Sequence, residues 1–324
     1  MKTFALFVST LFVYSCAYTP QSEQVRSVGI ESLPQKVELS ETPFFPQTAH
    51  QCGPAALATV LQSHGVEVTP EDLSKEIYLP EREGSLQIEI SVAARRHDML
   101  PYPIDPHLND LFSEVAAGNP VLVMQNLGFD WAPQWHYAVV IGYNLQSHEV
   151  ILRSGTNRRW TTPIDVFERS WQRADHWGLA VVPAGQIPAT AVPEKFLKTA
   201  YAFEETGKTI TAYEAYQAAT RRWPESSVIW LTFGNLAYTH EEWKQSVDAF
   251  YQVVYLDPGS ISGWNNLAYA LKTIDCSTQA KSALKCALAI KPDDANLKQS
   301  WRELSVLSET AKSTACPVIN CKPE

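Results

Sequence analysis

A period of 34 residues governs the last third of the chain. Three prolines and two tryptophans recur at that spacing: Pro224, Pro258, Pro292, Trp230 and Trp264. Small residues share equivalent places in the period, and so do bulky ones: Ala212 with Ala280, Ala219 with Ala287, and Tyr216 with Phe250 and Leu284. Small residues let paired helices approach, bulky residues fill the gaps, and proline ends each unit. The period therefore predicts a stack of helix pairs.

This pattern resembles the tetratricopeptide (TPR) repeat, whose period it shares over three units. We expect three repeats and a capping helix within 194–312, with the capping helix at 296–308, and a cysteine-containing tail at 313–324. The resemblance implies an all-α solenoid with a concave groove that binds a protein partner. A structural spacer or a dimer interface is the alternative.

The part of the chain before the repeats predicts a second domain. A chain of 324 residues is longer than one core usually serves. The stretch 183–193 is rich in proline, alanine and glycine, so we place a linker at 184–193 and a domain at 41–183. Helices come first in this domain and short apolar strands follow, which is an α+β pattern with an antiparallel sheet. The expected helices cover 52–64, 70–77, 85–93, 109–117 and 165–171, and the expected strands cover 120–124, 135–143, 150–152 and 179–182.

The first residues predict export. Lys2 precedes an apolar run at 4–13 that is too short to span a bilayer. We interpret residues 1–15 as a signal peptide. Residues 16–40 are polar and contain proline, so we expect them to form a tether.

The end of the signal peptide resembles a bacterial lipobox, read from Val13 to Cys16. The resemblance implies that Cys16 is lipidated and anchors the protein to a membrane. The bulk of Tyr14 leaves plain cleavage open. Ala17 after the cysteine implies, through the same resemblance, the periplasmic face of the outer membrane.

Cysteine use fits an exported protein. Four of the six cysteines lie in the C-terminal part: Cys276, Cys286, Cys316 and Cys321. Four cysteines allow three disulfide pairings, and the sequence does not choose among them. The net charge of −9 argues against a nucleic-acid partner. We expect no metal or cofactor, since the chain has neither a His-Glu-x-x-His helix nor a glycine-rich nucleotide loop.

The clearest chemical signal surrounds Cys52, which stands directly before Gly53 and Pro54. An apolar, helix-forming run follows, so Cys52 is predicted at a helix N-terminus. Unpaired backbone N–H groups and the helix dipole stabilise a thiolate there. The alternative is a small core cysteine, with Gly-Pro marking the helix start.

A thiol nucleophile needs a histidine partner and donors for the oxyanion. His136 is the candidate partner because it begins the apolar strand at 137–143, where the sheet would fix its orientation. For an isolated histidine, a half-exposed side chain at a strand end is the simpler interpretation. Gln47, a few residues before Cys52, is the candidate oxyanion donor.

The positions that carry a second resemblance lie around Cys52 and His136 and after them: Gln47, 52–57, 135–140, Thr162, Phe167 and Trp171. This set resembles the bacteriocin-processing peptidases, also called double-glycine leader peptidases, which are papain-like cysteine peptidases. The resemblance implies a papain-like fold for residues 41–183. It also implies Cys52 as the nucleophile, His136 as its partner and Gln47 as an oxyanion donor.

The oxyanion donor departs from that family by one position. Gln47 lies five residues before Cys52, where the family usually has six. Either the loop is one residue shorter, or Gln51 takes the role.

The third member of the family's catalytic triad is missing from its expected place, which is a larger departure from the family pattern. The family has an aspartate after the strand that follows the histidine, and residues 152–157 contain no carboxylate. Ser154 falls near the expected place, and Asn157 is a second candidate for orienting His136. The orientation of the base matters strongly for the rate in such triads.

Two functions from different classes follow. The first is a membrane-anchored cysteine peptidase that hydrolyses a peptide or protein substrate brought by the repeats. In it, Trp131 and Trp135 would line a substrate groove, with aromatic packing on the sheet rim as the alternative. The second is a catalytically degenerate scaffold that grips a peptide without cleaving it.

Overall fold

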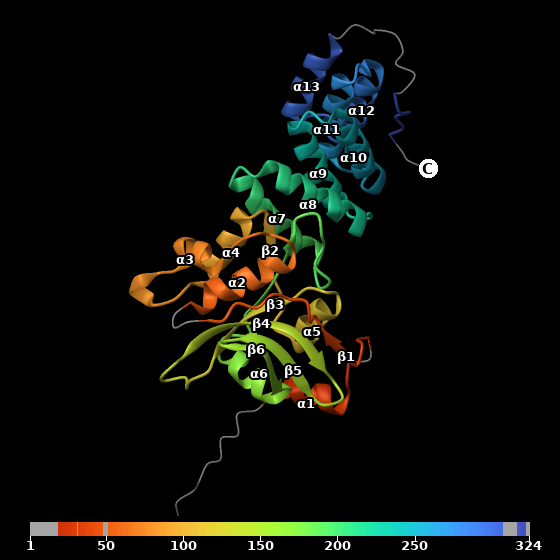
Figure 1. Cartoon of the computed structure of the whole chain (residues 1–324). Helices are drawn as coiled ribbons and strands as arrows, with labels where there is room; N and C mark the ends of the chain where they lie inside the picture. The colour runs from red at the N-terminus through yellow and green to blue at the C-terminus, as the bar shows by residue number, and fades with distance from the viewer. Residues whose placement is uncertain (1–18, 31, 48–50, 307–315, 322–324) are drawn as a thin grey trace, which may run out of the picture.

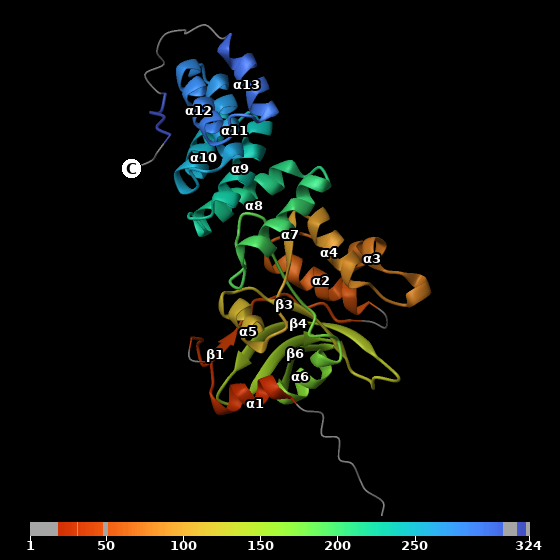
Figure 2. The same ribbon diagram turned by 180° about the vertical axis from the view of Figure 1, so that it is seen from behind.

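The structure is a computed structural model that describes residues 19–30, 32–47, 51–306 and 316–321. The expected signal peptide and the expected lipidation site, Cys16, lie outside these residues. Within them, a domain built on one sheet is followed by a helical solenoid (Figure 1). The view from behind shows the solenoid rising from one end of the sheet domain, with α1 (Pro20–Ser27) and α6 (Ile164–Gln172) at the other end (Figure 2).

Seven strands of the described chain form one antiparallel sheet. Its order is β2-β7-β3-β4-β5-β6, and β1 pairs with the end of β4. The strands are β1 (Lys36–Glu38), β2 (Met99–Pro103), β3 (Val121–Asn126), β4 (Trp135–Asn144), β5 (Glu149–Ser154), β6 (Asn157–Pro163) and β7 (Gly178–Pro183). The missing side chain of Gly142 lets β1 lie close, because a Cβ there would approach the Val37 carbonyl oxygen to 2.6 Å.

Helices cover both faces of this sheet. Besides α1 and α6 they are α2 (Cys52–Ser63), α3 (Pro70–Ile77), the short 3-10 helix η1 (Pro80–Arg82), α4 (Gln87–Arg96) and α5 (Leu108–Ala116). Along β4, Tyr137, Val139 and Ile141 pack in the core on the side of α2, α3 and α4. Ala138 and Val140 pack in the core on the side of α5 and α6. The middle of β4, residues 137–143, is apolar because both of its faces are buried there. The expected α+β fold is confirmed.

Residues 20–38 differ from the expected tether. Helix α1 is docked on α6, where the buried Glu168 carboxylate accepts the backbone N–H groups of Gln21 (3.0 Å) and Ser22 (2.6 Å). A carboxylate at a helix N-terminus is favourable for the helix dipole. The segment contains few apolar residues, so its polar sequence does not reveal this backbone contact. In the described part of the chain, no helix is long and apolar enough to cross a membrane.

The solenoid contains three helix pairs and a capping helix, within the residues described. Its helices are α7 (Pro193–Glu205), α8 (Thr209–Arg222), α9 (Ser227–Thr239), α10 (Trp243–Leu256), α11 (Ile261–Thr273), α12 (Ser277–Ile290) and α13 (Ala295–Ser305). Trp230 and Trp264 make the same contact one period apart. Their indole N–H groups donate to the carbonyls of Pro224 (2.7 Å) and Pro258 (2.9 Å). The expected all-α repeats are confirmed.

Two disulfides fasten the tail to α12. Cys276 is bonded to Cys316, and Cys286 is bonded to Cys321. This selects one of the three pairings that the sequence allows. Cys52 is the free cysteine of the described residues.

The segment expected as a linker, 184–193, is held firmly. Glu114 on α5 is fully buried, and its carboxylate accepts hydrogen bonds from Asn119 Nδ2 (2.7 Å), the Ala189 N–H (3.2 Å) and the Thr190 N–H (2.7 Å). One apolar cluster also joins β2 and β7 to α7 and α8. The solenoid therefore shares a core with the edge of the sheet instead of swinging on a hinge.

Candidate active site

Cys52 is the first residue of α2. Gln51 before it has a non-helical conformation, and its side chain does not cap the helix. The first backbone hydrogen bond of the helix runs from the Ala55 N–H to the Gln51 carbonyl (3.1 Å), and Pro54 has no N–H to offer. The amides of Cys52 and Gly53 thus stand at the positive end of the helix without a partner from the Gln51 side chain.

Gly53 is required by packing at this position. A Cβ on it would approach the Ser85 hydroxyl oxygen to 2.7 Å. The Ser85 segment is held there by the Tyr137 hydroxyl, which donates to the Ser85 carbonyl (3.2 Å). The glycine after the cysteine therefore marks a close approach of two segments as well as a helix start.

The Cys52 thiol is partly buried and free. Burial raises the pKa of this thiol, and the backbone N–H groups of Tyr137, Gly53 and Cys52 itself oppose that rise without reversing it. At neutral pH the group is therefore a thiol and not a thiolate. The same amides are in place to stabilise an anion when one forms.

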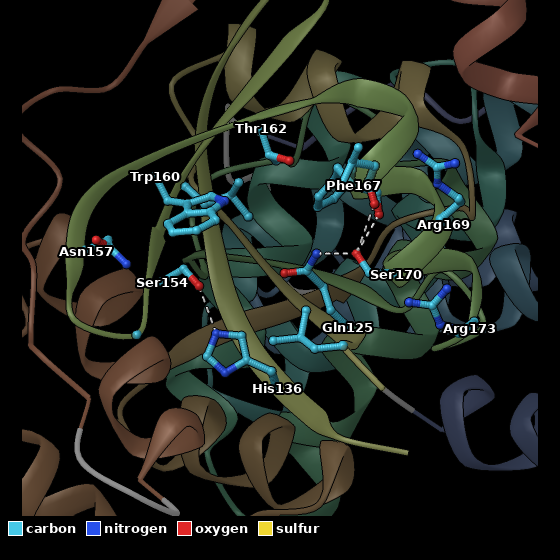
Figure 3. A pocket seen from close by; sticks show the side chains of 14 residues that line it. Gln125, His136, Ser154, Asn157, Trp160, Thr162, Phe167, Arg169, Ser170 and Arg173 are labelled. Carbon is cyan, nitrogen blue, oxygen red and sulfur yellow. Dashed lines mark hydrogen bonds between the residues drawn. The ribbon is translucent and has the colours of Figure 1, made fainter. Parts of the chain in front are cut away.

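His136 is the second residue of β4, on the opposite face of the strand from Tyr137. Its Nε2 lies 2.9 Å from the Oγ of Ser154, the last residue of β5 (Figure 3). Ser154 thus contacts the imidazole where an aspartate was expected. A hydroxyl brings no negative charge, and burial lowers the pKa of His136. The imidazole is therefore neutral at pH 7.

Asn157 lies across the β5–β6 turn from Ser154 and borders the same cavity as His136. Its side chain is exposed. Among the described residues, Ser154 and not Asn157 makes the hydrogen bond to the imidazole.

Gln47 fastens the segment before Cys52 to the sheet. Its Nε2 donates to the Tyr137 carbonyl (3.2 Å), and its Oε1 accepts the Gly155 N–H (3.1 Å). Its own N–H donates to the Gly155 carbonyl (3.0 Å). One hydrogen of the side-chain amide is used on Tyr137, so the second is the one that an oxyanion can take.

Arg153 supports this arrangement, although the sequence pattern does not single it out. Its guanidinium is buried and donates to the backbone carbonyls of Ser40 (2.8 Å) and Thr42 (2.9 Å). These contacts fix the segment that leads to Gln47. The available signal is an arginine inside an apolar strand, since a buried charge must find polar partners.

Cys52 and His136 meet the start of β4 from its two faces. The Cys52 sulfur interacts with the backbone N–H of Tyr137, the residue after His136. In the described chain no hydrogen bond joins the thiol to the imidazole, whose Nε2 bonds Ser154. Catalytic hydrogen bonds are often long in unliganded sites and tighten when substrate binds. Both groups are neutral, and they do not form an ion pair.

Trp131 lies in the loop between β3 and β4, and Trp135 is the first residue of β4. The two residues are 82% and 54% exposed. Trp131 stacks on Phe129 with ring centroids 5.6 Å apart. Neither tryptophan lines the cavity beside His136 in the described chain, so a role in a substrate groove stays a prediction.

A cavity of about 460 Å³ opens beside His136, between strands β4 to β6 and helix α6 (Figure 3). Its walls are formed by Gln125, Leu127, His136, Leu152, Ser154, Gly155, Asn157, Trp160, Thr162, Val166, Phe167, Arg169, Ser170 and Arg173. Gln125 and Trp160 are absent from the sequence prediction because neither belongs to a local motif. No group of three or more His, Cys, Asp or Glu side chains in the described ranges is placed to hold a metal ion.

The neutral state of the site predicts how Cys52 reacts with iodoacetamide. Because the thiolate is the nucleophile and the pKa of the thiol is raised, the labelling rate should increase about tenfold per pH unit from pH 6 to 9. An ion pair with His136 would give a plateau in that range instead. Mass spectrometry of the peptide that contains Cys52 measures the rate, and a plateau in the wild type would contradict the prediction.

The sheet domain is similar to a known family and to solved structures. A model of the Peptidase_C39 like family matches residues 39–178, the range that holds Cys52, His136 and Ser154. The chain is similar to the structure of a C39-like peptidase from Bacillus anthracis, with 19% identity over 46% of this chain and 98% of that chain and a TM-score of 0.40. It is also similar to the peptidase domain of Streptococcus ComA, a bifunctional ABC transporter involved in quorum sensing, with 18% identity over 44% of this chain and 99% of that chain and a TM-score of 0.35. A comparison with curated proteins finds no match.

The helical part has its own structural likenesses. One is the first TPR domain of Spaghetti (RPAP3), solved with an HSP90 peptide, at 13% identity over 35% of this chain and 90% of that chain and a TM-score of 0.33. Another is the TPR domain of Arabidopsis OM64, at 12% identity over 35% and 93% and a TM-score of 0.33. The family match and the sheet topology confirm the expected papain-like domain, and the three helix pairs confirm the solenoid that follows it.

Proposed function

We propose that this chain is a cysteine peptidase that hydrolyses peptide bonds in a peptide or protein substrate. The observation that carries the proposal is the position of Cys52. Its sulfur lies among backbone amides at the start of α2, and one of them is that of Tyr137, the residue after His136. The family match over the same residues supports it.

In this proposal His136 takes the proton of the Cys52 thiol as the sulfur attacks the scissile carbonyl carbon. The oxyanion is held by the Cys52 N–H and by the free hydrogen of the Gln47 amide. His136 then gives the proton to the leaving amine, and it activates the water that hydrolyses the thioester. Ser154 positions the imidazole ring.

We also propose that the protein is an exported bacterial lipoprotein, anchored through Cys16 at the periplasmic face of the outer membrane. The two disulfides of the C-terminal part support export, because such bonds persist in oxidising compartments. The solenoid would bind a protein partner or the substrate. A hollow of about 350 Å³ supports this, because it presents the hydrogen-bonded amides of Asn235 and Asn266 (2.9 Å) beside Tyr238 and Tyr269.

Covalent trapping tests the peptidase proposal. A mixture of peptide vinyl sulfones with varied sequences should form an adduct at Cys52, detected by peptide mass spectrometry. His136→Ala should slow adduct formation by at least about tenfold, because a general base is lost while the pKa of the thiol is high. Cys52→Ala should form no adduct there. If wild type and His136→Ala react equally fast, the catalytic assignment is wrong.

A second function, peptide binding without cleavage, is favoured by the neutral Ser154 hydroxyl in the place of a carboxylate. It predicts that Cys52→Ala keeps both partner binding and cellular function. A complementation assay in which the Cys52→Ala protein accumulates normally and yet fails would remove this alternative.

A further inference from the structure

The cavity between β4, β5, β6 and α6 has the character of a binding pocket. Its volume of about 460 Å³ lies in the range that proteins use for small ligands. Its walls are largely apolar and include Leu152, Trp160 and Phe167. Trp160 is 49% exposed, so one side of the indole is open to a ligand.

One buried polar group faces this apolar space with a fixed orientation. Gln125 is 6% exposed, and its Nε2 donates to Ser170 Oγ (2.6 Å). The Ser170 hydroxyl uses its own hydrogen on the Phe167 carbonyl (2.8 Å), so it can only accept from Gln125. The Gln125 side-chain oxygen is therefore the free end of the amide, and it points into the cavity toward Trp160 (Figure 3).

In the described chain the hydrogen bond of this amide runs from Nε2 to Ser170, and the oxygen is left open to the cavity. A ligand that brings an N–H or O–H group can donate to it. The arginines at the rim have less to offer, because Arg169 pairs with Asp165 (2.8 Å) and Arg173 donates to the Asn126 carbonyl (2.8 Å).

The position of the cavity relative to the nucleophile assigns it to one side of the substrate. Cys52 lies on the α2 face of β4 and keeps the acyl half after attack. His136 borders the cavity on the other face and gives its proton to the leaving amine. The amine half of the substrate is thus the half that lies next to this space.

We propose that the cavity is a specificity subsite for the residue directly after the scissile bond, and that it takes an aromatic side chain with a hydrogen-bond donor, tyrosine or tryptophan. The ring stacks on Trp160, and the hydroxyl or indole N–H donates to the Gln125 oxygen. The assignment of the pocket to the residue after the scissile bond rests on the proposed peptidase function. The binding of an aromatic side chain in the pocket does not depend on that function.

Calorimetry with the full chain carrying Cys52→Ala tests the pocket without turnover. Two amidated dipeptides, Tyr-Gly and Phe-Gly, are titrated. Tyr-Gly amide should bind about fivefold more tightly, the effect of one net hydrogen bond of about 1 kcal/mol. Equal affinities, or no binding of either peptide, would overturn the proposal.

Two further variants isolate the contact. Gln125→Met keeps the length of the side chain and removes the acceptor, so it should remove the preference for tyrosine while Phe-Gly amide still binds, which also shows that the pocket is folded. Glu225→Ala, at an exposed turn of the solenoid, should leave the preference unchanged. A tyrosine preference that persists in Gln125→Met would contradict the assignment.

Cleavage of peptide libraries by the wild type separates this proposal from the proposed function. Binding of tyrosine peptides without any cleavage would support the proposed pocket and contradict the peptidase function. Cleavage with no preference for tyrosine or tryptophan after the scissile bond would support the peptidase function and contradict the proposed subsite.

Discussion

Replacing Cys52 with alanine is expected to lower the rate of peptide hydrolysis at least about 10⁴-fold. In the proposed mechanism the thiol forms the acyl intermediate, and the amides around it cannot activate water by themselves. The measurement is the turnover of a cleaved peptide found in a library, with thermal unfolding recorded in parallel. The Cys52 side chain is small and partly buried, so the fold should persist.

The double variant sharpens this prediction. His136→Ala alone should lower the rate of hydrolysis nearly as much as Cys52→Ala. The double variant should be only a little slower than either single variant. Residues that act as one unit show such non-additive losses. If the rate loss of the double variant equals the product of the two single losses, the two groups work independently.

Asn157→Ala is the matched control for this series. Asn157 borders the same cavity as His136, but its side chain is exposed and makes no hydrogen bond to the imidazole in the described chain. The turnover of Asn157→Ala should stay within about twofold of that of the wild type, in line with the small effect of most surface substitutions. A large loss would move the orienting role from Ser154 to Asn157.

The sequence predicts the elements of this fold whose side chains are buried in a regular pattern. The apolar run around Val139 predicts a strand buried on both faces, and β4 is such a strand. Strand β6 escapes prediction because it is polar and mostly exposed at the sheet edge. Strand β2 escapes because Pro101 and Pro103 argue against a strand, although proline is tolerated at a sheet edge.

The candidate site likewise contains residues that the sequence predicts and residues that it does not. Cys52 and His136 carry local signals, a helix start and a strand start, and so the sequence finds them. The contact of Ser154 with His136 depends on the register of β5 against β4, where Arg153 pairs with Val139. Gln125 becomes notable only because α6 brings Ser170 to it. Contacts set by register and by packing between distant segments leave no short pattern to read.

The junction of the two domains gives the largest expected effect on stability. Glu114→Ala should lower the free energy of unfolding by about 3–5 kcal/mol, because it leaves several buried donors unsatisfied and each costs about 1–3 kcal/mol. The change leaves the N–H groups of Ala189 and Thr190 and the amide of Asn119 without their acceptor. Chemical denaturation measures the loss.

The same variant tests whether the solenoid and the sheet domain unfold together. In the wild type, the Glu114 contacts and the apolar cluster of β2, β7, α7 and α8 both couple the domains, so one cooperative transition is expected. In Glu114→Ala the cluster alone remains, and the transition should broaden or split in a calorimetric scan. Glu225→Ala, at an exposed turn of the solenoid, should change stability by less than about 0.5 kcal/mol. If Glu114→Ala unfolds like Glu225→Ala, the carboxylate does not hold the junction, and the coupling rests on the apolar cluster.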